Sequence, residues 1–340
     1  MQGTKEQRVS WQWRGASVDL GLSIHGDGPT VVMLPALSSI STRLEMAPLQ
    51  QRLASGFRTV AIDWPGFGDL PRPAVDWAPQ AYADYLAFVL GTLMPKPRAV
   101  VAAGHAAGYA LAHGCDHPDA FERLVLLAPT WRGPLPTMMK GRRPWFDRLC
   151  RMFDMPVLGS LLYRLNVNRL VVRYMAAGHV YVDPAWLDRA RLEQKLAVTR
   201  AGGARYASVR FVTGALDPLS SREEFLDRAR RIGIPVLTVY GAQTPRGSRA
   251  EIEALAAIPG MSSLMLPRGK LSFYEEFPDA TAGAILPFLA EGRDARAWRR
   301  LKRGAGVAFG VVHQPRRVFV PASSSSVLFG FGWPRTLRLG

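Results

Sequence analysis

The stretch 104–108, GHAAG, has the glycine spacing of a sharp turn that presents a nucleophile, yet it lacks the nucleophile itself. It follows the apolar run 99–103 and precedes a helical pattern. In a strand, turn and helix of this kind, a central serine projects outward and attacks carbonyl carbons. Here the central residue is Ala106, whose methyl group cannot attack. We expect the turn to hold Ala106 at positive φ and to need Gly104 and Gly108 for close packing of strand and helix.

Five polar side chains near this turn or in a basic insertion further along the chain are candidates for binding or proton transfer. His105 adjoins the turn centre, and Tyr109 follows it in the expected helix. Ser38 belongs to a serine-rich loop, Glu45 comes after that loop, and His179 lies in the insertion. A hydroxyl attacks only when a base is close, and no base adjoins Ser38 in the sequence. The alternative is structural: packing for His105, Glu45 and Tyr109, and a surface position for His179.

No metal site or cofactor is expected. His113 and His117 stand four residues apart, a spacing that can bind a metal, but the surrounding sequence favours an ordinary helix end. Cys115 and Cys150 form neither a disulfide framework nor a zinc-type group. Free cysteines fit a reducing compartment, so we expect a cytoplasmic protein.

Alternating strands and helices must position these residues. Short β-rich runs that end in Gly or Pro alternate with helical patterns, which is typical of a parallel sheet built from strand–helix–strand units. Strands are expected over 30–34, 59–63, 99–103, 124–128, 235–240 and 263–266, with two edge strands from a hairpin over 9–25. Helices are expected over 43–54, 80–93, 107–117, 221–231, 248–257 and 280–289. The fold class is therefore α/β.

An insertion of about 100 residues separates the strand at 124–128 from the next one. Its apolar residues recur at helical spacing with arginines on other faces, which predicts an all-helical cap over 131–213. The core then consists of 1–130 and 214–292. Within the second part, Ser221 and Glu224 form a capping box, and Asp217 before them is expected to be structural.

The net charge of +16 is concentrated in two segments. Residues 131–213 hold 15 basic and 5 acidic side chains, and residues 293–340 hold 10 and 1. Such a field attracts phosphates, anionic lipids or an acidic protein. The sequence has no zinc-finger spacing, no RNP-like motif and no basic helix with heptads, so specific nucleic-acid binding is not expected.

The remaining segments argue against a membrane protein. No apolar run approaches the 18 uncharged residues of a membrane span, and the first residues lack the apolar core of a signal peptide. Residues 293–340 lose all periodicity and contain a serine run, which predicts a basic, disordered tail. We expect contact with a membrane, if any, to be peripheral.

Several segments in order resemble the α/β-hydrolase superfamily with a helical cap, over about 9–290. Each segment is weak evidence by itself, whereas their order and spacing are specific. The resemblance implies a mostly parallel, doubly wound sheet flanked by helices, with the cap inserted after the strand at 124–128. It rests on the turn at 104–108 and on the stretches 25–35, 57–73, 121–129, 234–241 and 275–289.

The resemblance also implies a serine, an acid and a histidine in that chain order. The equivalent positions hold Ala106, Thr244 and Leu271, so all three catalytic groups are missing. Backbone N–H groups of Leu37 and Ala107 could still form an oxyanion hole, because such donors depend on the main chain and not on side-chain identity. A binding pocket can therefore be present without the catalytic side chains.

Three functions follow from these observations. The first is a protein without conventional serine-hydrolase activity that binds a small apolar or lipid-like ligand under the cap. The second is an active enzyme of this fold, either a hydrolase or a cofactor-free lyase or oxygenase, that uses non-standard residues such as His105 or His179. The third is an accessory protein whose basic cap and tail dock on an anionic membrane or an acidic protein. The oligomeric state is left open.

Overall fold

The computed structural model describes residues 4–292. The expected tail at 293–340 lies outside the described residues. The described chain forms one eight-stranded sheet in the order β1-β2-β4-β3-β5-β6-β7-β8. The strands are β1 (Lys5–Trp13), β2 (Ala16–His25), β3 (Thr30–Leu34), β4 (Arg58–Ile62), β5 (Ala99–Ala103), β6 (Leu124–Leu127), β7 (Val236–Gly241) and β8 (Ser262–Leu266).

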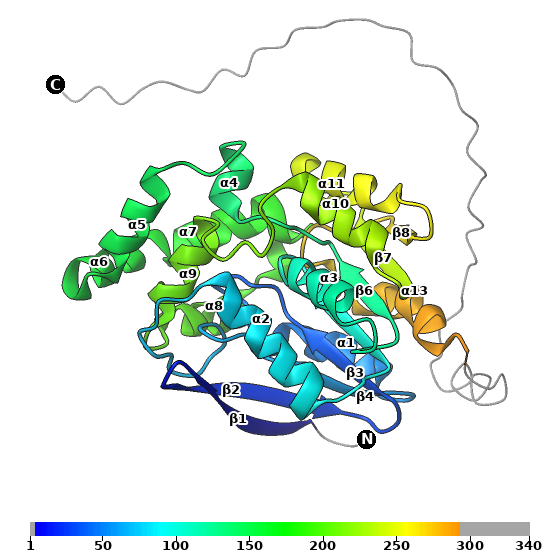
Figure 1. The fold of residues 1–340 in the computed structure, drawn as a ribbon. Helices are drawn as coiled ribbons and strands as arrows, with labels where there is room; N and C mark the ends of the chain where they lie inside the picture. The colour runs from blue at the N-terminus through cyan, green and yellow to red at the C-terminus, as the bar shows by residue number, and fades with distance from the viewer. Residues whose placement is uncertain (1–3, 293–340) are drawn as a thin grey trace, which may run out of the picture. The chain divides into compact units, whose positions relative to one another are not determined.

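The sheet is mostly parallel, as the sequence predicts. β1 pairs with β2 and β2 with β4 in antiparallel fashion, while the pairs from β4 through β3, β5, β6 and β7 to β8 are parallel. Helices cover both faces (Figure 1). The core helices are α1 (Ala47–Leu53), α2 (Pro79–Phe88), α3 (Ala106–Asp116), α10 (Arg222–Arg231), α11 (Arg246–Ala256), α12 (Phe273–Glu276) and α13 (Pro278–Ala290).

Alternating side chains of the central strands pack into two separate hydrophobic layers, one on each face of the sheet. In β5, Val100 and Ala102 pack with the layer under α2, α3, α10 and α11. Ala99, Val101 and Ala103 pack with the opposite layer under α1 and α13. Successive side chains of a strand point to opposite faces, so a short run without polar residues marks a strand buried on both sides. This arrangement explains the apolar runs of the sequence.

Most boundaries agree with the sequence-based ranges to within two residues. The expected capping box is present in part: the Ser221 hydroxyl accepts a hydrogen bond from the Glu224 N–H at 3.1 Å, while the Glu224 carboxylate reaches the Ser220 N–H. The helix expected over 43–54 is instead a short 3-10 helix, η1 (Arg43–Met46), followed by α1. Pro48 interrupts the pattern, because proline lacks the N–H of a continuing helix.

Residues 131–213, here called the helical insertion, contain helices and no strand. Two small apolar clusters hold these helices together. The main helices are α4 (Pro134–Met138), α5 (Trp145–Asp154), α6 (Pro156–Asn166), α7 (Arg169–Met175), α8 (Arg189–Arg200) and α9 (Ala204–Val212). A π-helical turn, η3 (Ala176–Val180), follows α7. In Figure 1 these helices group at one end of the sheet.

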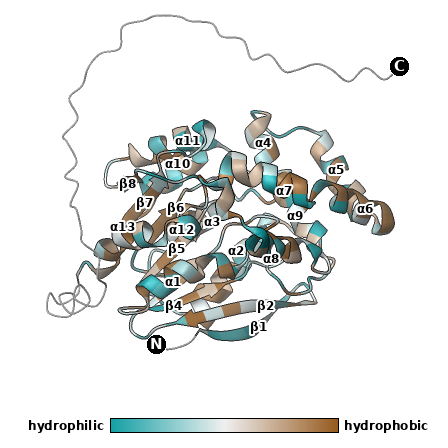
Figure 2. Ribbon diagram, turned by 180° about the vertical axis from the view of Figure 1, so that it is seen from behind, coloured by the Kyte–Doolittle hydropathy of each residue, from teal (hydrophilic) through white to brown (hydrophobic). Residues whose placement is uncertain are grey.

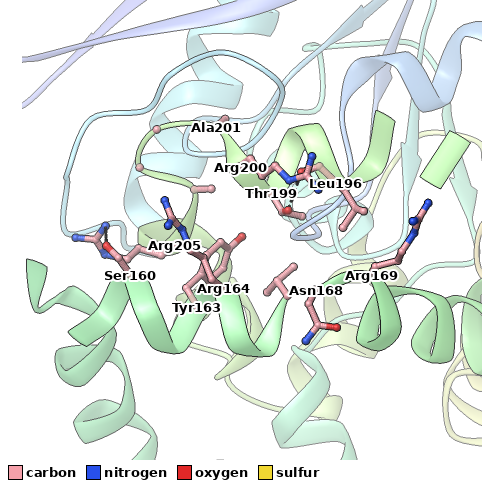
Figure 3. Close-up of a pocket in the computed structure, with 14 residues that line it drawn as sticks. Ser160, Tyr163, Arg164, Asn168, Arg169, Leu196, Thr199, Arg200, Ala201 and Arg205 are labelled. Atoms are coloured by element: carbon pink, nitrogen blue, oxygen red, sulfur yellow. Dashed lines mark hydrogen bonds between the residues drawn. The ribbon is translucent and has the colours of Figure 1, made fainter. Parts of the chain in front are cut away.

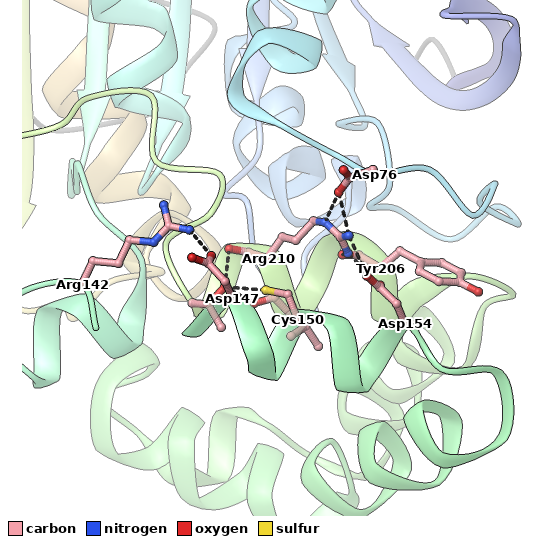
Figure 4. A network of polar contacts seen from close by, with 9 residues as sticks. Asp76, Arg142, Asp147, Cys150, Asp154, Tyr206 and Arg210 are labelled. Atoms are coloured by element: carbon pink, nitrogen blue, oxygen red, sulfur yellow. Dashed lines mark hydrogen bonds and ion pairs between the residues drawn. The ribbon is translucent and has the colours of Figure 1, made fainter. Parts of the chain in front are cut away.

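Arg210 of α9 ties the helical insertion to the core (Figure 4). Its guanidinium lies 2.7 Å from an Asp76 carboxylate oxygen in the loop before α2 and 2.8 Å from one of Asp154 in α5. The arginine side chain is buried, so these partners replace its lost hydration. Across residues 4–292, no helix is long and apolar enough to cross a membrane.

Candidate active site

The turn at 104–108 places its unusual backbone conformation at Gly104. Gly104 has a φ of 52°, whereas Ala106 is the first residue of α3 and does not have positive φ. The expectation that Ala106 has positive φ is therefore wrong, because the glycine without a Cβ absorbs the bend. Ala106 is 0% exposed, so its methyl group fills core space.

The packing role of the two glycines is confirmed. A Cβ on Gly104 would lie 3.2 Å from the Ala36 Cβ, and one on Gly108 would lie 3.0 Å from the Pro218 Cγ. Both distances are shorter than ordinary side-chain contacts, so larger residues would push the strand and loops away from α3.

Thr244 and Leu271, which the resemblance aligns with an acid and a histidine, carry no ionisable side chain. Thr244 is buried, its N–H donates to the Gly241 carbonyl at 3.0 Å, and its hydroxyl has no partner among residues 4–292. Leu271 is half-buried, and its N–H donates to the His179 carbonyl at 3.3 Å. Neither side chain can accept a proton from a nucleophile.

The two expected oxyanion donors differ in their surroundings. The Ala107 N–H donates to the Gly104 carbonyl at 3.2 Å, so the turn itself uses it. Leu37 is buried, and its N–H has no hydrogen-bond acceptor within residues 4–292. Ser38 is half-buried, and its hydroxyl accepts from the Ile40 N–H at 3.4 Å. An oxyanion hole that uses the Leu37 N–H stays a prediction. The Ala107 N–H is already engaged by the Gly104 carbonyl.

His105 and Tyr109 pack beneath the segment that leads into α10. The Tyr109 hydroxyl donates to the Leu216 carbonyl at 2.6 Å, and the His105 Nε2 lies 3.3 Å from the same oxygen. Burial lowers the pKa of His105 to about 4, so its ring is neutral at pH 7. Asp217 accepts from the Gly133 N–H at 2.8 Å, and burial raises its pKa to about 7. These contacts fit the structural alternative for His105 and Tyr109 and the structural role expected for Asp217.

The other histidines that the sequence analysis considers, His113, His117 and His179, lie outside the turn at 104–108. His179 lies exposed in η3. His113 and His117 face each other at the end of α3, with ring centroids 4.6 Å apart. Within residues 4–292, no three His, Cys, Asp or Glu side chains are grouped in the way that a metal ion needs.

A buried polar cluster lies next to the loop that follows β3. We call it the Glu45 cluster, and it consists of Glu45, Tyr181, Lys195, Tyr274 and Glu275. Glu45 comes from η1, Tyr274 and Glu275 come from α12, and Tyr181 and Lys195 come from the helical insertion. The cluster is therefore built where the insertion meets the core. Ala36 connects it to the turn, since Ala36 contacts Gly104 and its N–H donates to Glu45.

Short contacts hold each member in place. One Glu45 oxygen accepts from the Ala36 N–H and from the Tyr274 hydroxyl, both at 2.8 Å. The Lys195 ammonium lies 3.0 Å from a Glu275 oxygen and 3.7 Å from the second Glu45 oxygen. The Tyr181 hydroxyl donates to Glu275 at 2.9 Å. One ammonium thus stands between two carboxylates.

Burial and these neighbouring charges change the pKa values of Glu45 and Lys195. Burial raises the pKa of Glu45 to about 7; the Glu275 charge adds to this, while the Lys195 charge opposes it. Burial alone would lower the pKa of Lys195, but the carboxylates of Glu275 and Glu45 raise it above its usual value. Lys195 therefore stays charged near neutral pH, and Glu45 exchanges its proton there. A carboxylate that titrates at neutral pH is suited to general acid–base chemistry.

Sequence reasoning singled out Glu45 from this cluster and missed its partners. The family resemblance placed a histidine at the position of Leu271, and Tyr274 and Glu275 follow it three and four residues later. Lys195 carries no signal, because it is one of many basic residues on an arginine-rich helix. Only the fold brings it to the core.

Comparisons with known proteins agree on the fold. The model of the Alpha/beta hydrolase family matches residues 24–329. A curated relative, 2-(acetamidomethylene)succinate hydrolase from Mesorhizobium japonicum, is 23% identical over 279 residues, which cover 80% of this chain and 92% of the relative.

Solved structures give the same result at low identity. A thermophilic esterase from Thermogutta terrifontis, with malate bound, has a TM-score of 0.65 at 18% identity and covers 84% of this chain and 98% of its own. Cfl2 from Burkholderia cenocepacia has a TM-score of 0.64 at 21% identity and covers 84% and 96%. Similarity at this level establishes the fold and no particular reaction.

Proposed function

The chain belongs to the alpha/beta hydrolase family, and from this premise we propose that it hydrolyses a small anionic ester or amide without forming a serine ester. The observation that carries the proposal is Glu45, a buried carboxylate with a pKa of about 7 beside a lysine ammonium. The names of similar proteins, a hydrolase of a succinate derivative and an esterase, support this reaction class. The 15 basic residues of the helical insertion favour a negatively charged substrate.

In the proposed reaction, the Glu45 carboxylate takes a proton from water while the water oxygen bonds to the substrate carbonyl carbon. The Lys195 ammonium offsets the negative charge that develops on the carbonyl oxygen. The intermediate then releases its alcohol or amine, which receives the proton held by Glu45. The carbonyl part forms as a carboxylic acid, which gives its proton to solvent and leaves as a carboxylate, and the enzyme returns to its starting state. No step needs a covalent bond to Ala106.

Access to Glu45 requires movement of the helical insertion. The Glu45 side chain is 1% exposed, and Lys195 and Tyr181 cover it from the insertion side. We propose that substrate enters when α8 moves away from η1 and α12, and that return of Lys195 completes the site. Closure of this kind excludes water and strengthens the interaction between the ammonium and the carbonyl oxygen.

The test compares Glu45→Gln with Glu223→Gln, an exposed carboxylate on α10 without a hydrogen-bond partner among residues 4–292. Turnover of a panel of small anionic esters and amides is measured together with labelling by a fluorophosphonate. We expect turnover without labelling, and a loss of about 100-fold or more in Glu45→Gln alone, because a general base contributes about 10² to 10⁴. Labelling of the wild type, or equal turnover in both variants, would overturn the proposal.

A second candidate function is reversible binding of such a ligand without turnover. Its support is the closed packing around Ala106 together with the missing acid and histidine. A saturable rise in melting temperature with an ester that is never hydrolysed would favour binding over hydrolysis. Hydrolysis that depends on Glu45 would exclude it.

A further inference from the structure

A cavity of about 590 Å³ lies within the helical insertion, bounded by α6, α7, α8 and α9 (Figure 3). Its volume is that of a small-molecule site. Four arginines, Arg164, Arg169, Arg200 and Arg205, contribute to its wall, and the wall contains no Asp or Glu. Figure 3 shows these arginines spread along the length of the cavity, so its wall is positively charged.

The arginines are incompletely neutralised. Arg169 and Arg200 both reach Glu193, at 3.2 and 3.4 Å. Arg205 donates to the Phe153 carbonyl at 2.9 Å and to the Ser160 hydroxyl at 3.0 Å, neither of which carries charge. Arg164 has no ion pair within residues 4–292. The cavity wall therefore keeps a positive charge that structural ion pairs do not use.

A second, independent observation comes from behind the cavity wall. Gly202 and Gly203 line the cavity, and the Gly202 carbonyl accepts from the Arg72 N–H at 2.8 Å. Arg72 is 7% exposed, and its Nε and Nη1 have no partner among residues 4–292. Its Nη2 donates to backbone carbonyls, including that of Val198 at 3.0 Å. A buried guanidinium without a counter-ion is unfavourable, and a nearby anion would offset this cost.

The backbone at the same wall favours negative charge as well. α9 begins at this wall. Gly203 is its N-cap residue, and Ala204 and Arg205 lie in its first turn. The N-terminal end of a helix carries partial positive charge, which favours a nearby anion. Arginine side chains add forked donors that match carboxylate and phosphate oxygens.

We propose that this cavity binds a small organic molecule through a doubly charged oxyanion group, a phosphate monoester or a dicarboxylate. The arginines hold the oxygens, and the rest of the molecule lies against the remaining residues of the wall. The inference does not depend on hydrolysis at Glu45, since binding alone tests it. A substrate or an effector would both use the same groups.

The test is calorimetric titration of the full chain with inorganic phosphate, with phenyl phosphate and with succinate, and with neutral dimethyl succinate as a reference. The variant is Arg164→Ala, and Arg148→Ala on α5 is its matched control, exposed and outside the cavity wall. We expect saturable binding of a phosphate or of succinate, weakened about 10-fold in Arg164→Ala and unchanged in Arg148→Ala. Partial retention in Arg164→Lys would show that charge without the fork is insufficient.

The outcomes separate the two ligand chemistries. Tighter binding of phenyl phosphate assigns the site to phosphate esters, and tighter binding of succinate assigns it to dicarboxylates. Equal weakening by both alanine variants, equal binding of the neutral diester, or no binding up to about 10 mM would overturn the proposal. Both variants replace exposed arginines without structural partners, so unchanged melting temperatures will verify that they fold.

An apolar stripe on α6 and α7 supports a second proposal. Val157, Leu161 and Leu165 recur every four residues on α6, and each is more than half exposed. Leu170 and Tyr174 are similarly exposed on α7. Figure 2 shows α6 mostly in brown at the outer end of the helical insertion. Soluble surfaces seldom gather so many large apolar side chains in one short segment.

The positive charge near this stripe favours an anionic partner. Residues 155–182 contain Arg164, Arg169 and Arg173 and no acidic residue. We propose that the stripe docks on an anionic lipid bilayer, with the apolar side chains between the acyl chains and the arginines at the headgroups. A second copy of this chain would bring the same positive charges together, which opposes self-association through this stripe.

The full chain is sedimented with phosphatidylcholine vesicles with and without phosphatidylglycerol. The variant Leu161→Ser/Leu170→Ser is compared with Met265→Ser, which changes an exposed apolar residue of β8. We expect pelleting only with phosphatidylglycerol, reduced at least several-fold in the double variant and retained in the control. Equal pelleting of wild type and double variant would overturn the proposal. So would a dimer in solution that the double variant abolishes.

Discussion

Glu45→Gln should remove a pH dependence of stability that the buried carboxylate creates. The pKa of Glu45 rises from 4.5 to about 7 on folding, chiefly through burial. The folded state therefore binds this proton more tightly than the unfolded state does, and stability falls as pH rises from about 4.5 through 7. At about 1.4 kcal/mol per pH unit, the full loss is about 3 kcal/mol.

The substitution keeps the two hydrogen bonds that Oε1 accepts and replaces the oxygen that faces Lys195 by an amide nitrogen. A glutamine Oε1 can accept from the Ala36 N–H and the Tyr274 hydroxyl, as the Glu45 oxygen does. Lys195 retains Glu275 as its partner at 3.0 Å. The variant thus differs from the wild type mainly in lacking a group that titrates.

The assay is urea denaturation of both proteins between about pH 5 and pH 8, and the quantity is the difference in their free energies of unfolding. Asp63 and Asp217 also have raised pKa values, through burial, but they titrate in both proteins and cancel in the difference. We expect the wild type to lose about 2 to 3 kcal/mol relative to the variant over this range. A difference that stays constant with pH would refute the reasoning.

Three further changes test other parts of the structure. Ala106→Ser should not react with a fluorophosphonate, because position 106 is 0% exposed. It should lower the free energy of unfolding by about 1–3 kcal/mol through a buried unpaired hydroxyl; probe labelling and urea denaturation measure the two effects. Gly203→Ala should destabilise the protein by more than about 1 kcal/mol, because φ at this position is 75° and the new Cβ would lie 2.1 Å from the Arg72 carbonyl oxygen. Gly178→Ala should not, because its Cβ would meet no atom within 4 Å, and the melting temperatures of the two variants test this. Arg210→Met should cost about 1–3 kcal/mol and speed proteolysis of the helical insertion, because it removes the contacts to the core drawn in Figure 4.

The sequence predicts the sheet well because burial on both faces leaves a local signature. β3 and β5 occupy the ranges expected from their apolar runs, and the Ser221 cap marks the start of α10. The conformation of the turn was mispredicted for a local reason. An expectation transferred from turns that present a serine placed the positive φ at Ala106, whereas Gly104 takes it and lets α3 begin one residue earlier.

The Glu45 cluster could not be predicted, because its contacts join distant parts of the chain. Tyr274 contacts Glu45 across 229 positions, and Lys195 contacts Glu275 across 80. Neither pair has a spacing rule such as those within a helix or a turn. The arginine cavity has the same origin: its four arginines belong to four different helices, and along the sequence they are indistinguishable from a solvated basic face.

The two glycines and the alanine between them have one physical explanation. Gly104 and Gly108 are required because Ala36 and Pro218 occupy the space that larger side chains would need, and this holds for any residue at position 106. A small apolar residue at position 106 fits this buried turn without disturbing its packing. Under the proposed function, the reacting charges lie instead at the boundary between the helical insertion and the core. Lys195 comes from the insertion and Glu45 from η1 of the core, so a reaction at this site would depend on how the insertion is placed.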